Sequence, residues 1–130
     1  MSSDPGCEAA RILIVDDDPH MCLVLTKALG RGRAEIDVCH DGNEALKRVR
    51  HFKPHVVLLD YMLPRMDGFK VLRLLKGDAR LRDTRVILMT ASAEDEVSLE
   101  AQASGADGFL NKPLDLATVL RVVKSVVPQF

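Results

Sequence analysis

The sequence predicts an α/β fold, in which a five-stranded parallel sheet is covered by helices on both faces within a single domain. Two observations carry this prediction. Apolar runs typical of buried strands alternate along the chain with segments whose apolar residues recur at helical spacing. The 130 residues also suit one domain, because a chain of this size buries roughly two thirds of its unfolded surface.

The chain is expected to begin with a flexible leader over residues 1–10, which are rich in serine, proline and glycine. Residues 12–15 form an uninterrupted aliphatic run, typical of a strand buried on both faces. Asp18 and Pro19 then predict a helix start, since aspartate is a favoured N-cap and proline suits the first turn. This helix is expected to end near Gly30.

The rest of the chain repeats the alternation of strand and helix. Aliphatic or alternating apolar residues indicate the strands, and apolar stripes at three- and four-residue spacing indicate the helices. The expected elements are an edge strand around Ile36 and Val38, a helix over 43–52, a strand over 56–59, a helix over 69–76, a strand over 86–89, a less hydrophobic helix over 93–104, a strand over 108–110 and a helix over 116–127. Asp115 is expected to cap the last helix and Pro128 to stop it.

Composition and charge exclude several classes of function. The 18 basic and 19 acidic residues nearly cancel, so no overall field favours nucleic acid or a membrane surface. No apolar run approaches the roughly 20 residues that span a bilayer, and no signal-peptide pattern is visible. The three cysteines are odd in number and widely spaced, which favours a reducing, cytoplasmic location over a disulfide framework.

Asp16, Asp17 and Asp18 directly follow the first expected strand. Asp18 is explained as a helix cap, but two further adjacent carboxylates repel each other and favour a bound cation. Oxygen donors without a neighbouring cysteine or histidine favour a hard ion, and Mg²⁺ is the expected cofactor. The alternative is an acidic cluster with a structural role only.

Three more polar residues close later strands, so that a parallel sheet would bring them to the same edge. They are Asp60, Thr90 and Lys112. Each has a structural alternative, as a turn cap, a strand former or a solvated lysine. Together they suit phosphoryl transfer: a carboxylate beside Mg²⁺ can attack phosphorus, while an ammonium and a hydroxyl neutralise and bind the phosphoryl oxygens. Pro113 restricts the backbone at Lys112, and a cis bond there would aim the ammonium inward.

These motifs, in this order and at this spacing, resemble the receiver domains of bacterial two-component response regulators. The resemblance covers nearly the whole chain, as a receiver domain over residues 11–127 followed by a short C-terminal end, 128–130. It implies a flavodoxin-like, doubly wound sheet with strand order 2-1-3-4-5 and five helices. No output module is visible, so we expect either a stand-alone receiver or a piece of a longer protein.

The resemblance also implies a role for each site residue. Asp60 is the expected phosphoacceptor, and Asp16 and Asp17 match the acidic pair of the family. Asp17, Asp60 and the backbone carbonyl of Met62 are the expected Mg²⁺ ligands. Lys112 is the expected phosphate-binding lysine.

Thr90 and Phe109 match the switch residues of the family. The implied function is acceptance of a phosphoryl group from a sensor histidine kinase or a histidine phosphotransfer protein. The surface of the fourth helix, fifth strand and fifth helix would then switch toward a downstream protein target or an attached output domain. The resemblance implies a monomer or a weak homodimer.

Two other functions compete with this interpretation. A phosphohydrolase of the haloacid dehalogenase type would use Asp60 covalently, but such enzymes usually carry a second aspartate two residues later, where this chain has Met62. A degenerate receiver would bind partners without phosphorylation. The complete set of acceptor, acidic pair, threonine and lysine favours a phosphorylatable signalling domain, which catalyses only its own phosphorylation and dephosphorylation.

Overall fold

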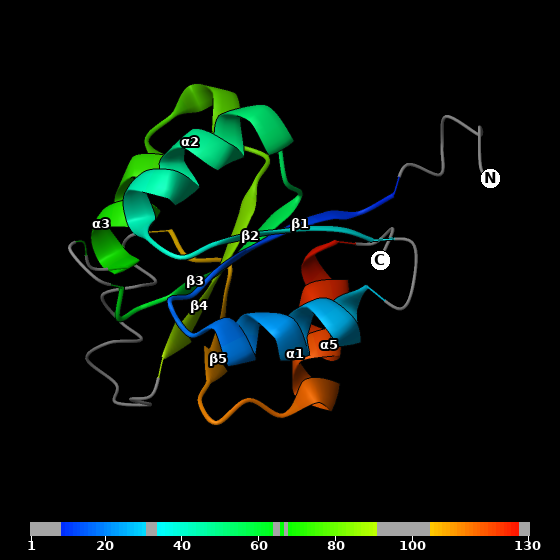
Figure 1. Ribbon diagram of the computed structural model, residues 1–130. Coiled ribbons are helices and arrows are strands. Elements are labelled where there is room, and N and C mark those ends of the chain that lie inside the picture. Colours follow the sequence, from blue (N-terminus) through cyan, green and yellow to red (C-terminus); the bar gives the residue numbers. More distant parts are fainter. Residues whose placement is uncertain (1–8, 31–33, 64–65, 67, 91–104, 128–130) are drawn as a thin grey trace.

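The computed structural model describes residues 9–30, 34–63, 66, 68–90 and 105–127. In this part of the chain strands and helices alternate as expected (Figure 1). The elements are β1 (Arg11–Val15), α1 (Pro19–Leu29), β2 (Glu35–Cys39), α2 (Gly42–Phe52), β3 (Val56–Asp60), α3 (Gly68–Lys76), the short 3₁₀ helix η1 (Ala79–Leu81), β4 (Arg85–Thr90), β5 (Gly108–Asn111) and α5 (Leu116–Val126).

The five strands form one parallel sheet in the order β2-β1-β3-β4-β5. This confirms the predicted fold class and the strand order that the resemblance implies. The register places Asp60 beside Met89 and Thr90 beside Asn111. The carboxyl ends of the inner strands therefore lie close together at one edge of the sheet.

Helices cover both faces of the sheet, with α2 and α3 on one side and α1 and α5 on the other (Figure 1). Because side chains alternate along a strand, each inner strand contributes to two hydrophobic layers. The layer under α2 and α3 includes Leu13, Val57, Leu59, Val86 and Leu88. The layer under α1 and α5 includes Ile12, Ile14, Val56, Leu58 and Ile87. Burial on both faces explains the continuous aliphatic runs of β1, β3 and β4.

Two details differ from the sequence-based expectations. Asp115 occupies the N-cap position of α5, but its side chain accepts no backbone N–H there. It accepts the hydroxyl of Thr118 instead, at 2.8 Å, so the predicted N-cap position is confirmed although the side chain caps no backbone N–H. The 3₁₀ helix η1 was not predicted, because three residues are too few to show a periodicity.

The helix expected over 93–104 lies outside the described residues, as do most of the leader and residues 128–130. Within the described part of the chain, no helix has both the length and the apolar character needed to cross a bilayer.

Candidate functional site

The predicted site residues converge at the carboxyl edge of the sheet. Asp16 follows β1, Asp60 ends β3, Thr90 ends β4 and Lys112 follows β5. The buried aliphatic strands fix this arrangement, because they align the ends of four segments that are distant in sequence. This edge of an open α/β sheet is where such folds usually bind ligands.

Lys112 joins two of the aspartates. Its Nζ lies 2.9 Å from Oδ2 of Asp16 and 3.3 Å from Oδ2 of Asp60. The backbone N–H of Lys112 donates to the carbonyl of Thr90 at 2.8 Å, which attaches the residue to the end of β4. The peptide bond between Lys112 and Pro113 is cis. One ammonium therefore lies between two carboxylates that are both distant from it in the sequence.

The adjacent residues Asp16 and Asp17 have different surroundings. Asp16 is fully buried, and its carboxylate accepts the N–H of Asp18 at 3.0 Å and contacts Lys112. Asp17 is exposed, and its side chain has no hydrogen bond or ion pair among the described residues. Asp16 is thus part of the folded framework, whereas Asp17 is available to an external ligand.

Asp60 is 4% exposed, and its Oδ1 accepts the N–H of Met62 at 3.2 Å. Burial and the charge of Asp16 raise the pKa of Asp60, while Lys112 and the Met62 N–H oppose the rise. Burial alone would lower the pKa of Lys112, but its hydrogen bond to Asp16 and the charges of Asp60 and Asp16 outweigh that effect and raise it. Lys112 therefore stays protonated beside an excess of negative charge.

The carboxylates could hold a metal ion. Asp16, Asp17 and Asp60 each offer an oxygen, and these oxygens all lie within 4.8 Å of one another. A donor set of oxygens alone fits a hard divalent cation such as Mg²⁺. Such a cation would also offset the repulsion by Asp16, which together with burial raises the pKa of Asp60. Met62 lies two residues after the end of β3, and the predicted role of its carbonyl as a ligand stays a prediction.

Thr90 and Phe109 lie on neighbouring strands and face the same side of the sheet. Thr90 is 3% exposed at the end of β4 and pairs with Asn111, two residues after Phe109 in β5. Because side chains two residues apart share a face, Phe109 lies diagonally beside Thr90. Phe109 is partly buried against the layer under α2 and α3. A movement of Thr90 would therefore change the surroundings of the Phe109 ring.

Sequence reasoning missed three supports of this site. Gly68, the first residue of α3, lies so close to β3 that a Cβ there would be 2.8 Å from the carbonyl oxygen of Asp60. Cys22 donates from Sγ to the carbonyl of Asp16 at 3.3 Å, and Nδ1 of His40 lies 3.0 Å from that same oxygen. The glycine was visible as a turn residue, but its close neighbour was not, and nothing in the sequence indicates the other two contacts.

Known proteins share this organisation. The model of the response regulator receiver domain family matches residues 12–124. Regulatory protein VanRB of Enterococcus faecalis is 36% identical over 117 residues, which are 90% of this chain and 52% of VanRB. Protein PilH of Pseudomonas aeruginosa is 33% identical over 118 residues, which are 91% of this chain and 98% of PilH. The chain thus spans about half of VanRB and nearly all of PilH.

Solved structures agree with the sequence relatives. Chemotaxis response regulator CheY4 of Vibrio cholerae superimposes with a TM-score of 0.87 at 27% identity, covering 92% of this chain and all of that one. The receiver domain of a DNA-binding response regulator from Colwellia psychrerythraea gives a TM-score of 0.86 at 30% identity, covering 92% of this chain and 98% of that one. Fold, site geometry and sequence relatives agree, and the chain belongs to the family of response regulator receiver domains.

Proposed function

We propose that the chain accepts a phosphoryl group on Asp60 from a phosphorylated histidine of a sensor kinase or a phosphotransfer protein. The observation that carries this proposal is the position of Asp60 at the carboxyl edge of the sheet. There it lies within 4.8 Å of the oxygens of Asp16 and Asp17 and 3.3 Å from the ammonium of Lys112. This set of charges suits a phosphoryl group and a divalent cation together.

In the proposed reaction, a carboxylate oxygen of Asp60 forms a bond to phosphorus. The bond between phosphorus and the nitrogen of the donor histidine breaks, and that nitrogen keeps the electron pair. Lys112 is already protonated and lies beside the carboxylate of Asp60. It therefore neutralises the phosphoryl oxygens without a change of protonation. A Mg²⁺ ion bound by Asp17, Asp60 and the carbonyl of Met62 would supply further positive charge. The Thr90 hydroxyl would donate to a phosphoryl oxygen.

The phosphoryl group would act as a switch through Thr90 and Phe109. Phosphorylation adds charge and strong hydrogen-bond acceptors at Asp60, which favours the arrangement with Thr90 turned toward them. Phe109 lies on the same face of the next strand and would move into the space that Thr90 leaves. The phosphoryl group shifts the equilibrium only because it interacts better with one arrangement than with the other.

The signal would leave the domain through a protein contact. The surface we assign to it comprises β5, α5 and the helix expected over 93–104. Its partner is a separate target protein or an output domain joined to the receiver. In this role the domain catalyses only its own phosphorylation and dephosphorylation.

Intact mass spectrometry after incubation with a small-molecule phosphodonor tests the proposal. The arms are the native protein with Mg²⁺, the native protein with EDTA, Asp60→Asn with Mg²⁺, and Asp83→Asn with Mg²⁺. Asp83 is an exposed aspartate just before β4, at the other end of the sheet. We expect one phosphoryl adduct in the native protein and in Asp83→Asn with Mg²⁺, and none in the other two arms.

A phosphorylated histidine kinase serves as a second donor if the small molecule gives no adduct. Absence of an adduct with both donors would contradict the proposal and favour the degenerate receiver. An adduct that persists in Asp60→Asn would place the phosphoacceptor elsewhere.

A further inference from the structure

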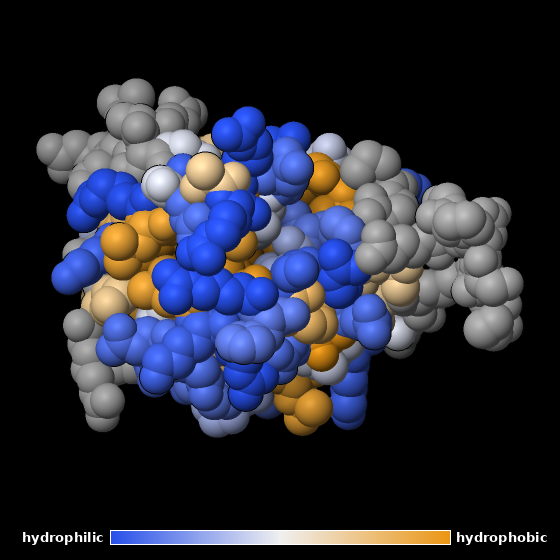
Figure 2. Space-filling view, turned by 90° about the horizontal axis from the view of Figure 1, so that it is seen from above, coloured by the Kyte–Doolittle hydropathy of each residue, from blue (hydrophilic) through white to orange (hydrophobic). Residues whose placement is uncertain are grey.

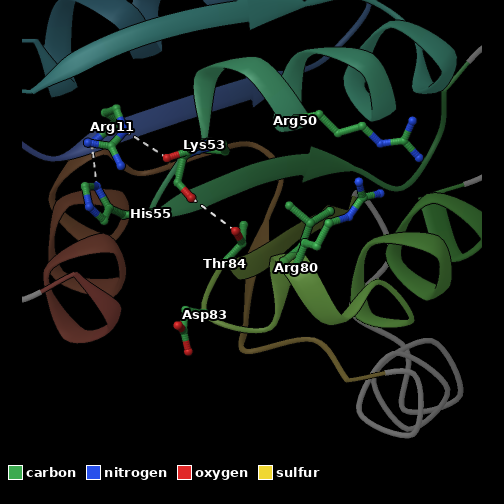
Figure 3. A pocket seen from close by; sticks show the side chains of 9 residues that line it. Arg11, Arg50, Lys53, His55, Arg80, Asp83 and Thr84 are labelled. Atoms are coloured by element: carbon green, nitrogen blue, oxygen red, sulfur yellow. Dashed lines mark hydrogen bonds between the residues drawn. The ribbon is translucent and has the colours of Figure 1, made fainter.

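A cavity lies at the opposite end of the sheet from Asp60. Its volume is about 520 Å³, within the usual range for small-molecule sites. Figure 3 shows it between the start of β1, the end of α2 and η1. His55 lines this cavity, and Asp60 lies five residues further along the same strand segment. At about 3.3 Å per strand residue, the two sites are roughly 17 Å apart.

The cavity is strongly basic. Four cationic side chains line it, against one carboxylate in the lining, that of Asp83; the four are Arg11, Arg50, Lys53 and Arg80. Figure 3 shows Arg50 and Arg80 extending toward the same side of the cavity, with Arg11 at the other side. Clustered like charges repel, so the arrangement favours an anionic ligand.

Two of these cations have no carboxylate partner in the described part of the chain. Arg80 is bound by Asp78, with contacts of 3.1 Å and 3.0 Å. Arg50 and Lys53 form no salt bridge among the described residues. Lys53 therefore offers its charge to a bound molecule, and Arg50, whose charge also acts on Asp78, offers a guanidinium that no carboxylate in the described part of the chain binds directly.

The backbone conformation of Lys53 is unusual. Lys53 ends α2 in the left-handed region, with φ 51° and ψ 60°, and it is the one non-glycine residue with positive φ among those described. Glycine adopts this conformation without steric cost and is the usual residue there. A cation near the end of the helix would favour its dipole, but Arg50 and His51 already supply the last turn with basic groups.

The wall of the cavity is held in place by hydrogen bonds. The side-chain Nε of Arg11 donates to the carbonyl of Lys53 at 2.8 Å, and the backbone N–H of Arg11 donates to Nδ1 of His55 at 2.9 Å. The hydroxyl of Thr84 donates to the carbonyl of Pro54 at 3.2 Å. These bonds join the starts of three strands, so little order has to be gained when a ligand binds.

From this geometry we infer that the cavity binds a phosphorylated small molecule with at least two negative charges. Arginine guanidinium groups match phosphate oxygens in pairs, and several of them favour a polyanion over a single carboxylate. A neighbouring hollow of about 460 Å³ shares Arg50 and Leu81 with the cavity and adds Arg73, together with Asp78, whose carboxylate binds Arg80. It provides room for the rest of a ligand of nucleotide size.

Calorimetric titration at physiological ionic strength, in EDTA, tests this inference. The probes are inorganic pyrophosphate and ADP, which separate binding of the phosphates alone from binding of a nucleotide. We expect saturable binding of ADP to the native protein. Arg50→Gln should weaken it at least about tenfold, as expected for the loss of one charge-assisted hydrogen bond.

Lys47→Gln is the matched control, since Lys47 is an exposed cation on α2 outside the cavity. It should leave the affinity unchanged, as should Asp60→Asn at the other end of the sheet. Lys53→Gly should weaken binding while keeping or raising the melting temperature, because glycine suits the left-handed conformation. This separates a role in binding from a role in folding.

Three results would overturn the inference. One is no saturable binding of either probe, and another is equal weakening by Arg50→Gln and Lys47→Gln. The third is binding of an acidic peptide with no binding of pyrophosphate or ADP, which would make the basic cavity a protein-docking site.

Discussion

Asp16 and Asp17 show how two identical neighbours acquire different roles. Asp16 is buried and bound by Lys112 and by the N–H of Asp18. Asp17 is exposed and has no partner among the described residues. The sequence predicted the pair as a metal site because two carboxylates need a cation. It did not show which one supports the fold, since that depends on a lysine 96 residues away.

Asp17→Asn therefore tests the metal site without disturbing the fold. Loss of a charged ligand should weaken Mg²⁺ binding at least about tenfold, because even outer-shell partners of metal sites contribute that much. The free energy of unfolding without metal should change by no more than about 0.5 kcal/mol, as for other exposed residues. Mg²⁺ titration and chemical denaturation in EDTA measure the two quantities.

Asp41→Asn offers a comparison at a carboxylate outside the site. Asp41 accepts the N–H of Glu44 at 2.8 Å as the N-cap of α2. Its replacement should leave Mg²⁺ affinity unchanged. Equal loss of Mg²⁺ affinity in both variants, or none in Asp17→Asn, would contradict the assignment of Asp17.

The junction between the secondary-structure elements β3 and α3 depends on one glycine. A Cβ on Gly68 would lie 2.7 Å from Cα of Tyr61 and 2.8 Å from the carbonyl oxygen of Asp60. Both neighbours are backbone atoms, so they cannot move aside as a flexible side chain would. The N–H of Gly68 also donates to the carbonyl of Tyr61 at 2.8 Å, which holds the first turn of α3 against the end of β3.

Gly68→Ala should consequently lower the free energy of unfolding by about 1–3 kcal/mol, the usual cost of overpacking. It should also slow labelling of Asp60 by a phosphodonor, because the displaced backbone carries the acceptor. Gly108→Ala is the control: its Cβ would meet side-chain atoms at 3.4 Å and 3.5 Å, which is ordinary contact. Denaturation curves and labelling rates that are the same in both variants would contradict the role of Gly68.

The elements themselves were largely predictable, and the reason is physical. Strands buried on both faces are continuous aliphatic runs, so β1, β3 and β4 were placed to within one or two residues. The basic cavity could not be predicted in this way. Its cations come from the start of β1, the end of α2 and η1, and only the folded sheet brings these segments together.

Across the domain, opposite charges gather at opposite ends of one parallel sheet. Carboxylates surround Lys112 at the carboxyl end, and arginine and lysine side chains line the cavity at the amino end. The near-zero net charge of -1 conceals this separation. The face seen in Figure 2 is mostly hydrophilic, with apolar areas between its polar side chains.

Each of the two hydrophobic layers also contains one buried thiol. Cys22 lies in the layer under α1 and α5, and Cys39 in the layer under α2 and α3. Burial is the main cause that raises the pKa of Cys22 from 9.0 to about 11 and that of Cys39 from 9.0 to about 12. Nearby carboxylates, Asp16 for Cys22 and Glu44 for Cys39, add to the rise.

These raised values predict that the protein loses stability in alkaline solution. Below pH 9 both thiols are protonated in the folded and in the unfolded chain. Their contribution to the free energy of unfolding is therefore fully present there. Above that pH the unfolded chain releases its thiol protons first, which favours unfolding. The loss grows until the pH passes the folded values, and for Cys22 it reaches about 3 kcal/mol at about 1.4 kcal/mol per pKa unit.

Chemical denaturation of the native protein and of the double variant Cys22→Ala, Cys39→Ala measures this effect on both sides of pH 9. The variant starts from a lower stability because two core side chains are shortened, so the comparison concerns the slope with pH. The raised pKa of Lys112 is common to both proteins, so it does not account for a difference between their slopes. The slope should be clearly smaller in the variant, and parallel slopes would show that the thiols do not set the alkaline limit of the fold.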